Sequence, residues 1–192
     1  EPERASAWVL KARALQALKR DDEAGEAFAS GVEVAPDEPA PLLLLANYHR
    51  RRDEPSKAEP MYRKLVELEP GFASHAALAA FLAADGERDI EAEEAYRKAL
   101  EVAEPERKAS AYSLLANFFH ARDRSEEAEA VLREGIDAEK GNLELIYGLA
   151  RFYHTRGETE KADVMIEEAT KADPDDPKPY LLLSSYRGRQ GD

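Results

Sequence analysis

The sequence contains no cysteine, no long apolar run and no run of alternating β-branched residues. Without cysteine, the chain cannot form a disulfide bond, a thiolate nucleophile or a Cys-based metal site. No stretch approaches the roughly 18 consecutive apolar residues of a membrane span, so we expect no direct insertion into a membrane. Val and Ile are scattered and never alternate over a run, so the signal for strands is missing. These absences favour a helical protein.

Basic residues are scarce relative to acidic ones. The chain has 27 Lys and Arg against 40 Asp and Glu, which gives a formal net charge of −13 with His neutral. A surface this acidic disfavours nonspecific binding to the phosphates of nucleic acids and of anionic membranes. We therefore expect no nucleic-acid partner.

The common sequence motifs of catalysis are also absent. Glycine loops that cradle phosphate, Ser-x-Gly elbows and His-Glu-x-x-His patterns are all missing. Adjacent glutamates such as Glu93 and Glu94 point about 100° apart on a helix, so they cannot converge on one substrate. We expect no enzyme activity, no catalytic residue, no cofactor and no metal site.

What the sequence does contain is a small residue that recurs at a nearly fixed interval. Five alanines follow one another at a spacing of about 34 residues: Ala24, Ala58, Ala92, Ala128 and Ala162. Four residues after each alanine stands a large apolar residue: Phe28, Tyr62, Tyr96, Leu132 and Ile166. A small residue at one helical site lets two helices approach closely, and the large residue one turn later fills the space beside it.

An earlier helix and a later proline complete the period. The earlier helix carries its own small residue: Ala12, Ala46, Ala79, Ala116 and Ala150. Prolines close four of the periods: Pro36, Pro70, Pro105 and Pro174. With these features in register, the chain resembles a tetratricopeptide-repeat (TPR) protein, a family with a period of about 34 residues. The resemblance implies an all-α, right-handed α-solenoid of helix-turn-helix repeats. It implies a single array over residues 1–192, with repeats at approximately 5–38, 39–71, 72–108, 109–142 and 143–176 and the first helix of a sixth at 177–192.

One residue and two stretches depart from this pattern, and Lys11 is the residue, because it stands where a leucine is expected. The stretch Gly86–Ala92 is one residue longer than the pattern requires, and the linker Ala103–Ala109 also looks longer. In the second repeat we favour Ser56 as N-cap with Glu59 in a capping box, which places Pro60 in the first turn of its helix. The alternative is an earlier helix start, at Asp53, in which case Pro60 must kink the helix.

The two ends of the sequence suggest a longer array. Pro2 lies one full period before Pro36, where the closing proline of a preceding repeat would stand, so we interpret the chain as a fragment. Near the other end, Leu181–Leu183 and Tyr186 make the last helix apolar around much of its circumference, unlike a capping helix. We expect copies of the chain to associate through this C-terminal helix as a homo-oligomer.

In TPR proteins, the first helix of each pair lines a concave groove that binds extended peptides or partner helices. The resemblance places groove-facing sites one and four residues beyond each first-helix small residue, and these sites contain no carboxylate; in the sixth repeat they hold Ser185 and Gly188. From these sites and an earlier one on the same face we select the candidates that can donate hydrogen bonds: Arg13, Asn47, Arg50, Asn117, His120, Tyr147, Arg151 and His154. We predict a donor-rich groove for an extended, acidic segment. The alternative is that these are ordinary solvated side chains.

The four histidines divide into two sets. His120 and His154 occupy equivalent sites of adjacent repeats, so their rings are expected roughly 10 Å apart. This is too far for shared metal ligation, so groove lining is the preferred interpretation, with a pH-sensitive groove as the alternative. His49 stands where a core aromatic residue is usual and His75 begins a helix, so both are expected to pack inside.

The leading functional hypothesis is a non-catalytic protein–protein interaction scaffold that binds a peptide or partner segment in the concave groove. The rival is a self-assembling structural module of a bacterial secretion or envelope complex, which associates through exposed solenoid ends. An enzyme or small-molecule receptor built in the groove is a third alternative. The high content of Ala, Arg, Glu and Asp resembles a GC-rich bacterial source. The sequence does not choose between a cytoplasmic and a periplasmic or envelope-associated location.

Overall fold

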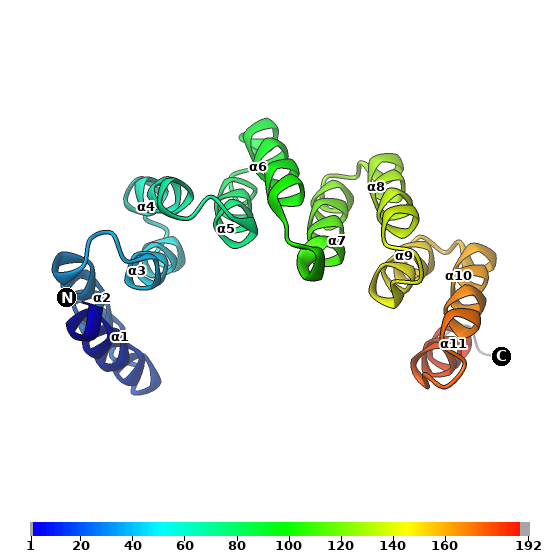
Figure 1. The fold of residues 1–192 in the computed structure, drawn as a ribbon, viewed down its shortest axis with the longest axis horizontal. Helices are drawn as coiled ribbons and strands as arrows, with labels where there is room; N and C mark the ends of the chain where they lie inside the picture. The colour runs from blue at the N-terminus through cyan, green and yellow to red at the C-terminus, as the bar shows by residue number, and fades with distance from the viewer. Residues whose placement is uncertain (1, 189–192) are drawn as a thin grey trace. The chain divides into compact units, whose positions relative to one another are not determined.

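The computed structural model describes residues 2–188, and within them the side chains of residues 4–182 and 184. These residues form eleven helices and no strand. In chain order the helices are α1 (Pro2–Ala17), α2 (Asp21–Val34), α3 (Pro39–Arg51), α4 (Pro55–Leu68), α5 (Phe72–Leu82), α6 (Asp89–Val102), α7 (Pro105–Ala121), α8 (Ser125–Ala138), α9 (Leu143–Thr155), α10 (Thr159–Ala172) and α11 (Lys178–Gly188). Consecutive helices pack in pairs, from α1 with α2 to α9 with α10 (Figure 1). The prediction of an all-α fold built from helix pairs is confirmed.

Packing divides the chain into two compact units. The N-terminal unit is Glu1–Val102, with α1 to α6, and the C-terminal unit is Ala103–Asp192, with α7 to α11. Within the units, second helices contact the following first helices: α2 with α3, α4 with α5, α8 with α9, and α10 with α11. First helices also contact each other, α1 with α3 and α7 with α9. A single array over residues 1–192 stays a prediction.

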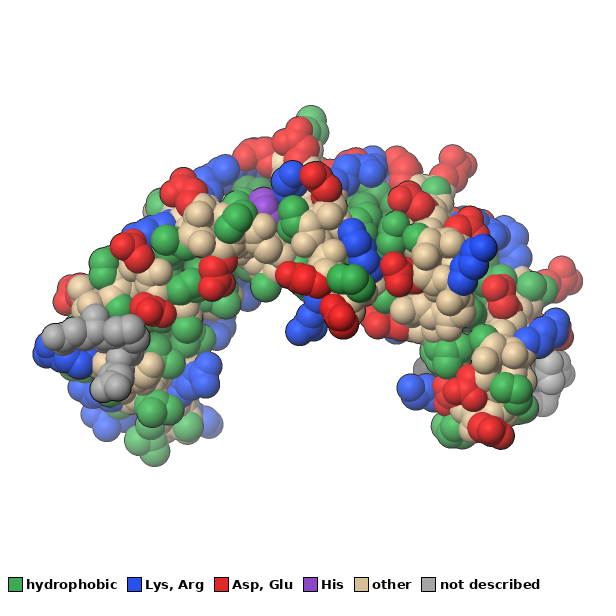
Figure 2. Space-filling view, viewed as in Figure 1, with side chains coloured by type: hydrophobic (Ala, Val, Ile, Leu, Met, Phe, Trp, Pro, Cys, Tyr) green, Lys and Arg blue, Asp and Glu red, His purple; other side chains and the backbone are tan. Residues whose placement is uncertain are grey.

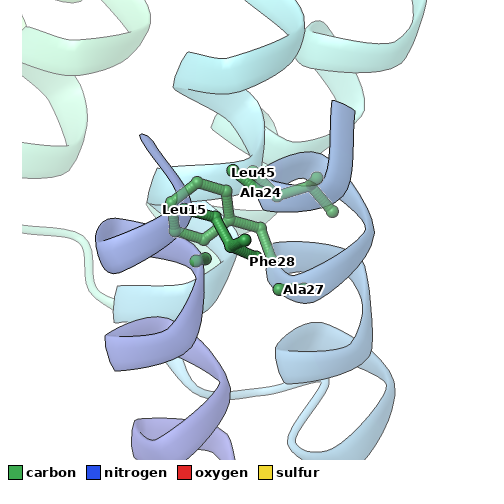
Figure 3. Packing of buried hydrophobic residues seen from close by; sticks show 6 residues of the cluster. Leu15, Ala24, Ala27, Phe28 and Leu45 are labelled. Atoms are coloured by element: carbon green, nitrogen blue, oxygen red, sulfur yellow. The ribbon is translucent and has the colours of Figure 1, made fainter. Parts of the chain in front are cut away.

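The recurring alanines lie at the contacts between helices. All five are 0% exposed: Ala24, Ala58, Ala92, Ala128 and Ala162. The large apolar residues that follow them are each at most 8% exposed. Figure 3 shows one such contact, in which Phe28 of α2 packs with Leu15 of α1 and Leu45 of α3. The methyl group at each alanine site therefore allows the close spacing of the helices.

A tight turn joins the two helices of four pairs. One residue in each of these turns has a positive φ: Lys19 (60°), Asp53 (57°), Asp123 (57°) and Gly157 (74°). The third pair differs, because α5 ends at Leu82 and α6 begins only at Asp89. The extra residue predicted near Gly86 is thus accommodated in a longer turn.

Two local predictions are wrong. The helix α4 begins at Pro55 with Glu54 as N-cap, so Ser56 is not the N-cap and Pro60 lies inside the helix. Proline's fixed φ suits the first turn, which explains the start at Pro55. The linker Ala103–Ala109 is not long, because α7 begins at Pro105 and its added residues extend the helix.

A network of four charged side chains joins α4 to the start of α6. Arg88 donates to both carboxylate oxygens of Glu59, at 2.8 and 2.9 Å, and also to Glu91 at 2.9 Å. Arg63 pairs with the same two glutamates, at 2.8 and 3.0 Å. The hydrogen bonds from Arg88 are the main reason that the pKa of Glu59 falls to about 2, although burial opposes the shift. The network fixes the third helix pair on the second.

Gly31 of α2 and Gly135 of α8 occupy the same position of the repeat, seven residues after the recurring alanine, but the free space beside them differs. A Cβ at Gly135 would lie 2.8 Å from Cγ of the buried Tyr112, whereas a Cβ at Gly31 would meet no atom closer than 3.4 Å. We expect Gly135→Ala to lower the free energy of unfolding by about 1–3 kcal/mol because it overpacks the contact. We expect Gly31→Ala to raise it by about 0.5–1 kcal/mol because alanine is the better helix former. Urea unfolding followed by circular dichroism measures both, and effects of the same sign would contradict this expectation.

The Glu59 network predicts a specific pH dependence. Because the folded-state pKa of Glu59 is lowered from 4.5 to about 2, its stabilisation is complete above pH 4.5 and is lost as the pH falls toward 2. We expect Glu59→Gln to cost about 1 kcal/mol of unfolding free energy at neutral pH, a value discounted for solvent screening. The difference from the wild type should shrink across that acidic window. Glu94→Gln, at an exposed site of α6, is the control and should leave the pH profile unchanged.

Candidate functional site

Three of the selected residues meet in a cavity of the C-terminal unit. Asn117 and His120 come from α7, and Arg151 comes from α9. The cavity measures about 450 Å³ and is open to solvent. We call it the donor cavity; its polar and aromatic lining residues are Ser113, Asn117, His120, Arg151, Phe152 and Thr155.

Helix geometry explains why these side chains share one surface. Asn117 and His120 are three residues apart on α7, and Arg151 and Thr155 are four apart on α9, so each pair lies on one face of its helix. Since α7 and α9 contact each other, the two faces border the same space. Phe152, also on α9, places its ring edge-on to His120 with the ring centroids 5.5 Å apart.

The buried Tyr153 fixes the orientation of α9. Its hydroxyl donates to Glu129 of α8 at 2.7 Å and accepts from Arg133 at 2.6 Å. Burial and the bond to Glu129 raise the pKa of Tyr153 to about 12. Arg151 is two residues before Tyr153 and therefore points to nearly the opposite side of the helix. Anchoring Tyr153 on α8 thus turns Arg151 toward the donor cavity.

The donor cavity has cationic and hydrogen-bonding groups but no carboxylate. Within the described part of the chain, no hydrogen bond or ion pair engages the side chains of Asn117, His120 or Arg151. The amide of Asn117 and the guanidinium of Arg151 are therefore free to donate to a ligand. Carboxylates and peptide carbonyls are the acceptors that suit these donors.

Two other candidates in the C-terminal unit lie outside the donor cavity. The hydroxyl of Tyr147 donates to Asp176, in the link between α10 and α11, at 2.8 Å, which gives Tyr147 a structural role. Burial, followed by this hydrogen bond, raises the pKa of Tyr147 to about 12. His154 is half-buried, and neither it nor Tyr147 is among the residues that line the donor cavity.

The three candidates in the N-terminal unit do not converge on one cavity. Arg13 is exposed on α1. Asn47 is half-buried, and its Oδ1 accepts a hydrogen bond of 2.8 Å from the buried Tyr62 hydroxyl. Arg50 lines a separate cavity of about 710 Å³, whose lining also includes the carboxylates Asp53 and Asp85. The absence of carboxylates therefore holds for the donor cavity and not for this one.

The two histidines expected to have packing roles contact their neighbours as expected, with His49 half-buried and His75 buried. His49 Nδ1 lies 2.7 Å from Glu54, and its ring is edge-on to Tyr48 at 5.4 Å. His75 is 9% exposed in α5, and burial lowers its pKa. Both predictions are confirmed.

Some predictions fall outside what the structure describes. The side chains of Leu183, Ser185, Tyr186 and Gly188 are not among the described ones. Between residues 2 and 188, no helix has both the length and the hydropathy of a membrane span. The described side chains include no group of three or more His, Asp or Glu that could hold a metal ion.

The sequence did not identify the floor of the donor cavity. Ala116, Leu132 and Gly148 form its apolar part. Gly148 lies three residues before Arg151 on the same helical face, and its lack of a side chain opens the space between α7 and α9. That spacing is the signal that could have pointed to a cavity here.

Comparison with known proteins identifies the family. Two tetratricopeptide-repeat models match residues 5–38 and 119–186, which together make up just over half of the chain. The chain is a TPR protein. The stacked helix pairs and the buried alanines, which recur about every 34 residues, are the structural form of that repeat. No curated protein matches the chain by sequence.

Solved structures of other TPR proteins share the fold. TTC0263, a thermophilic TPR protein in Thermus thermophilus, is 20% identical, with a TM-score of 0.60 over 95% of this chain and 98% of that chain. PilW, described as a widely conserved type IV pilus biogenesis factor, is 17% identical, with a TM-score of 0.62 over 96% and 86%. YrrB, described as a TPR protein with an unusual peptide-binding site, is 16% identical, with a TM-score of 0.52 over 92% and 90%. At these identities the likeness shows the fold.

The equivalent residues Asn47 and Asn117 should respond differently to truncation. Asn47→Ala removes the acceptor of the buried Tyr62 hydroxyl, so we expect a loss of about 1 kcal/mol of unfolding free energy. Asn117→Ala removes no described hydrogen bond and introduces a better helix former, so we expect no loss. Urea unfolding of both variants tests this, and equal destabilisation would assign Asn117 a structural role.

Proposed function

We propose that this TPR protein is a non-catalytic protein–protein interaction scaffold that binds an extended segment of a partner in the donor cavity. Its family supports a binding role, because stacked helix pairs form extended binding surfaces. The observation that carries the proposal is the convergence of Asn117, His120 and Arg151, with no carboxylate, on a chain of net charge −13. YrrB, described as having a peptide-binding site, shares the fold.

The chemistry of the donor cavity favours a segment that carries a carboxylate. Arg151 can offer two parallel N–H groups to a carboxylate, and the Asn117 amide can hold a backbone carbonyl beside it. The apolar floor around Leu132 suits an apolar side chain of the same segment. An extended peptide with an acidic residue next to an apolar one meets all three requirements.

The double substitution Asn117→Ala with Arg151→Ala tests this function. An array of extended peptides on the full chain should show binding of acidic peptides with apolar neighbours, and the double variant should weaken it at least about tenfold, because charge-assisted hydrogen bonds are lost. The affinity should also fall with added salt. Fluorescence anisotropy with the selected peptides measures both effects.

A matched control uses the same residue type on the same unit. Arg107 is exposed in the first turn of α7 and does not line the donor cavity, so Arg107→Ala should leave peptide binding unchanged. Equal losses for Arg107→Ala and the double variant would assign the binding to overall charge. Self-association that disappears with Leu182→Glu, without any peptide binding, would instead support the rival role in self-assembly.

A further inference from the structure

Another cavity of the N-terminal unit, distinct from the one that Arg50 lines, has a chemistry opposite to that of the donor cavity. It measures about 720 Å³, is open to solvent, and lies among α3, α4 and α5. Its apolar lining residues include Ala40, Leu43, Leu65, Ala73 and Ala77. Glu38 and Glu69 line it as well, and the lining contains neither Lys nor Arg. We call it the acidic-rimmed groove.

The two glutamates have no partner within the described chain. Neither the Glu38 nor the Glu69 side chain makes a hydrogen bond or ion pair with any described residue. Glu38 is the N-cap of α3, where the helix dipole favours a negative charge, whereas Glu69 is the C-cap of α4, three residues before α5. The nearby Asp37 differs, because its carboxylate pairs with Lys64 at 3.0 Å.

The third polar lining residue is Ser74, and its hydroxyl is already engaged in hydrogen bonds within the chain. Ser74 is 9% exposed, and its hydroxyl donates to the backbone carbonyl of Glu69 and accepts from the Gly71 N–H at 3.3 Å. Binding in the groove must therefore come from apolar contact along the floor and from the carboxylates at the rim. Three of the six apolar lining residues are alanines, whose small side chains leave room for an apolar side chain of the ligand.

We propose that the acidic-rimmed groove docks a partner segment in which apolar side chains alternate with lysine or arginine. An apolar side chain fills the space over Leu43 and Ala77, and the flanking cation pairs with Glu38 or Glu69. This site is separate from the donor cavity: its ligand carries basic residues, and its lining belongs entirely to the N-terminal unit.

The test uses the full chain and a short capped peptide that alternates leucine and lysine. Two companion peptides replace lysine by glutamate or leucine by serine. We expect the leucine–lysine peptide alone to bind in fluorescence anisotropy, and amide chemical shifts of α3 and α5 to change on titration. Equal binding of the leucine–glutamate peptide, or no binding of any peptide, would overturn the proposal.

Variants of the groove distinguish specific docking from general attraction to an acidic protein. Glu38→Gln and Glu69→Gln should each weaken binding about two- to fivefold, the range of exposed ion pairs. Ala73→Arg, at an exposed helical site, should weaken it at least about tenfold, because it fills the groove and repels the cation. The matched controls are Glu94→Gln and Ala130→Arg, which make the same changes at exposed sites outside the groove. Equal effects of variants and controls would overturn the proposal.

Two further measurements test whether the acidic-rimmed groove acts independently of the donor cavity and whether a second copy of the chain occupies it. The Asn117→Ala, Arg151→Ala variant should bind the leucine–lysine peptide like the wild type. The two proposals can therefore fail independently, because each concerns a different peptide and a different cavity. Sedimentation of the wild type and Ala73→Arg tests whether a second copy occupies the groove. Dimers of the wild type that Ala73→Arg dissociates would overturn the proposal of a basic partner segment.

Discussion

The close approach of helices at the five fully buried alanines is the constraint on which the remaining structure depends. At these positions the paired helices have room only for a methyl group, and the aromatic or aliphatic residue one turn later fills the space that remains. Gly135 shows how tight such contacts are, since even a Cβ there would meet the Tyr112 ring. The interior positions are therefore restricted to a few residue types. The exposed face of each first helix has no such restriction, and there the repeats present different side chains.

Charged side chains on the second helices also recur at fixed positions relative to the buried alanines. A glutamate directly follows three of the alanines, and each pairs with an arginine four residues later, at 2.8–2.9 Å: Glu59–Arg63, Glu93–Arg97 and Glu129–Arg133. Exposed pairs of this kind add little stability individually. Further partners tie some of them into larger networks: Glu59 also accepts hydrogen bonds from Arg88, and Glu129 accepts one from the Tyr153 hydroxyl. Acidic side chains are spread over the visible surface of both units (Figure 2). The donor cavity is an exception to this surface, because its lining contains no carboxylate.

The repeat architecture was predictable from sequence because its signal recurs five times, whereas each site depends on single positions. Asn47 and Asn117 have the same place in the repeat, and pattern alone assigns them the same role. They differ because the large residue four positions after the alanine is Tyr62 in one repeat and Leu132 in the other. Tyr62 has a hydroxyl that needs an acceptor in the interior, and Asn47 provides it. Leu132 needs none, so the Asn117 amide remains available in the donor cavity. The start of α4 was mispredicted for a similarly local reason, because a proline in the first turn determined it rather than a capping serine.

The turns between repeats, and not only the helix faces, contribute charged side chains to the cavities. Glu38 is the residue before α3, and the residue at the same place before α9 is Asn142. Asn142 uses its side chain to cap its own helix, accepting from the Leu145 N–H at 3.3 Å, so it offers no carboxylate to a ligand. Glu69 stands three residues before α5, and the equivalent residue before α9 is Lys140. The residue before α7, Glu104, is acidic like Glu38, so the charge at these turn positions differs between the turns before α7 and α9 of the C-terminal unit. Because these residues bear little of the packing between helices, the charge of a groove can change from repeat to repeat while the fold is kept.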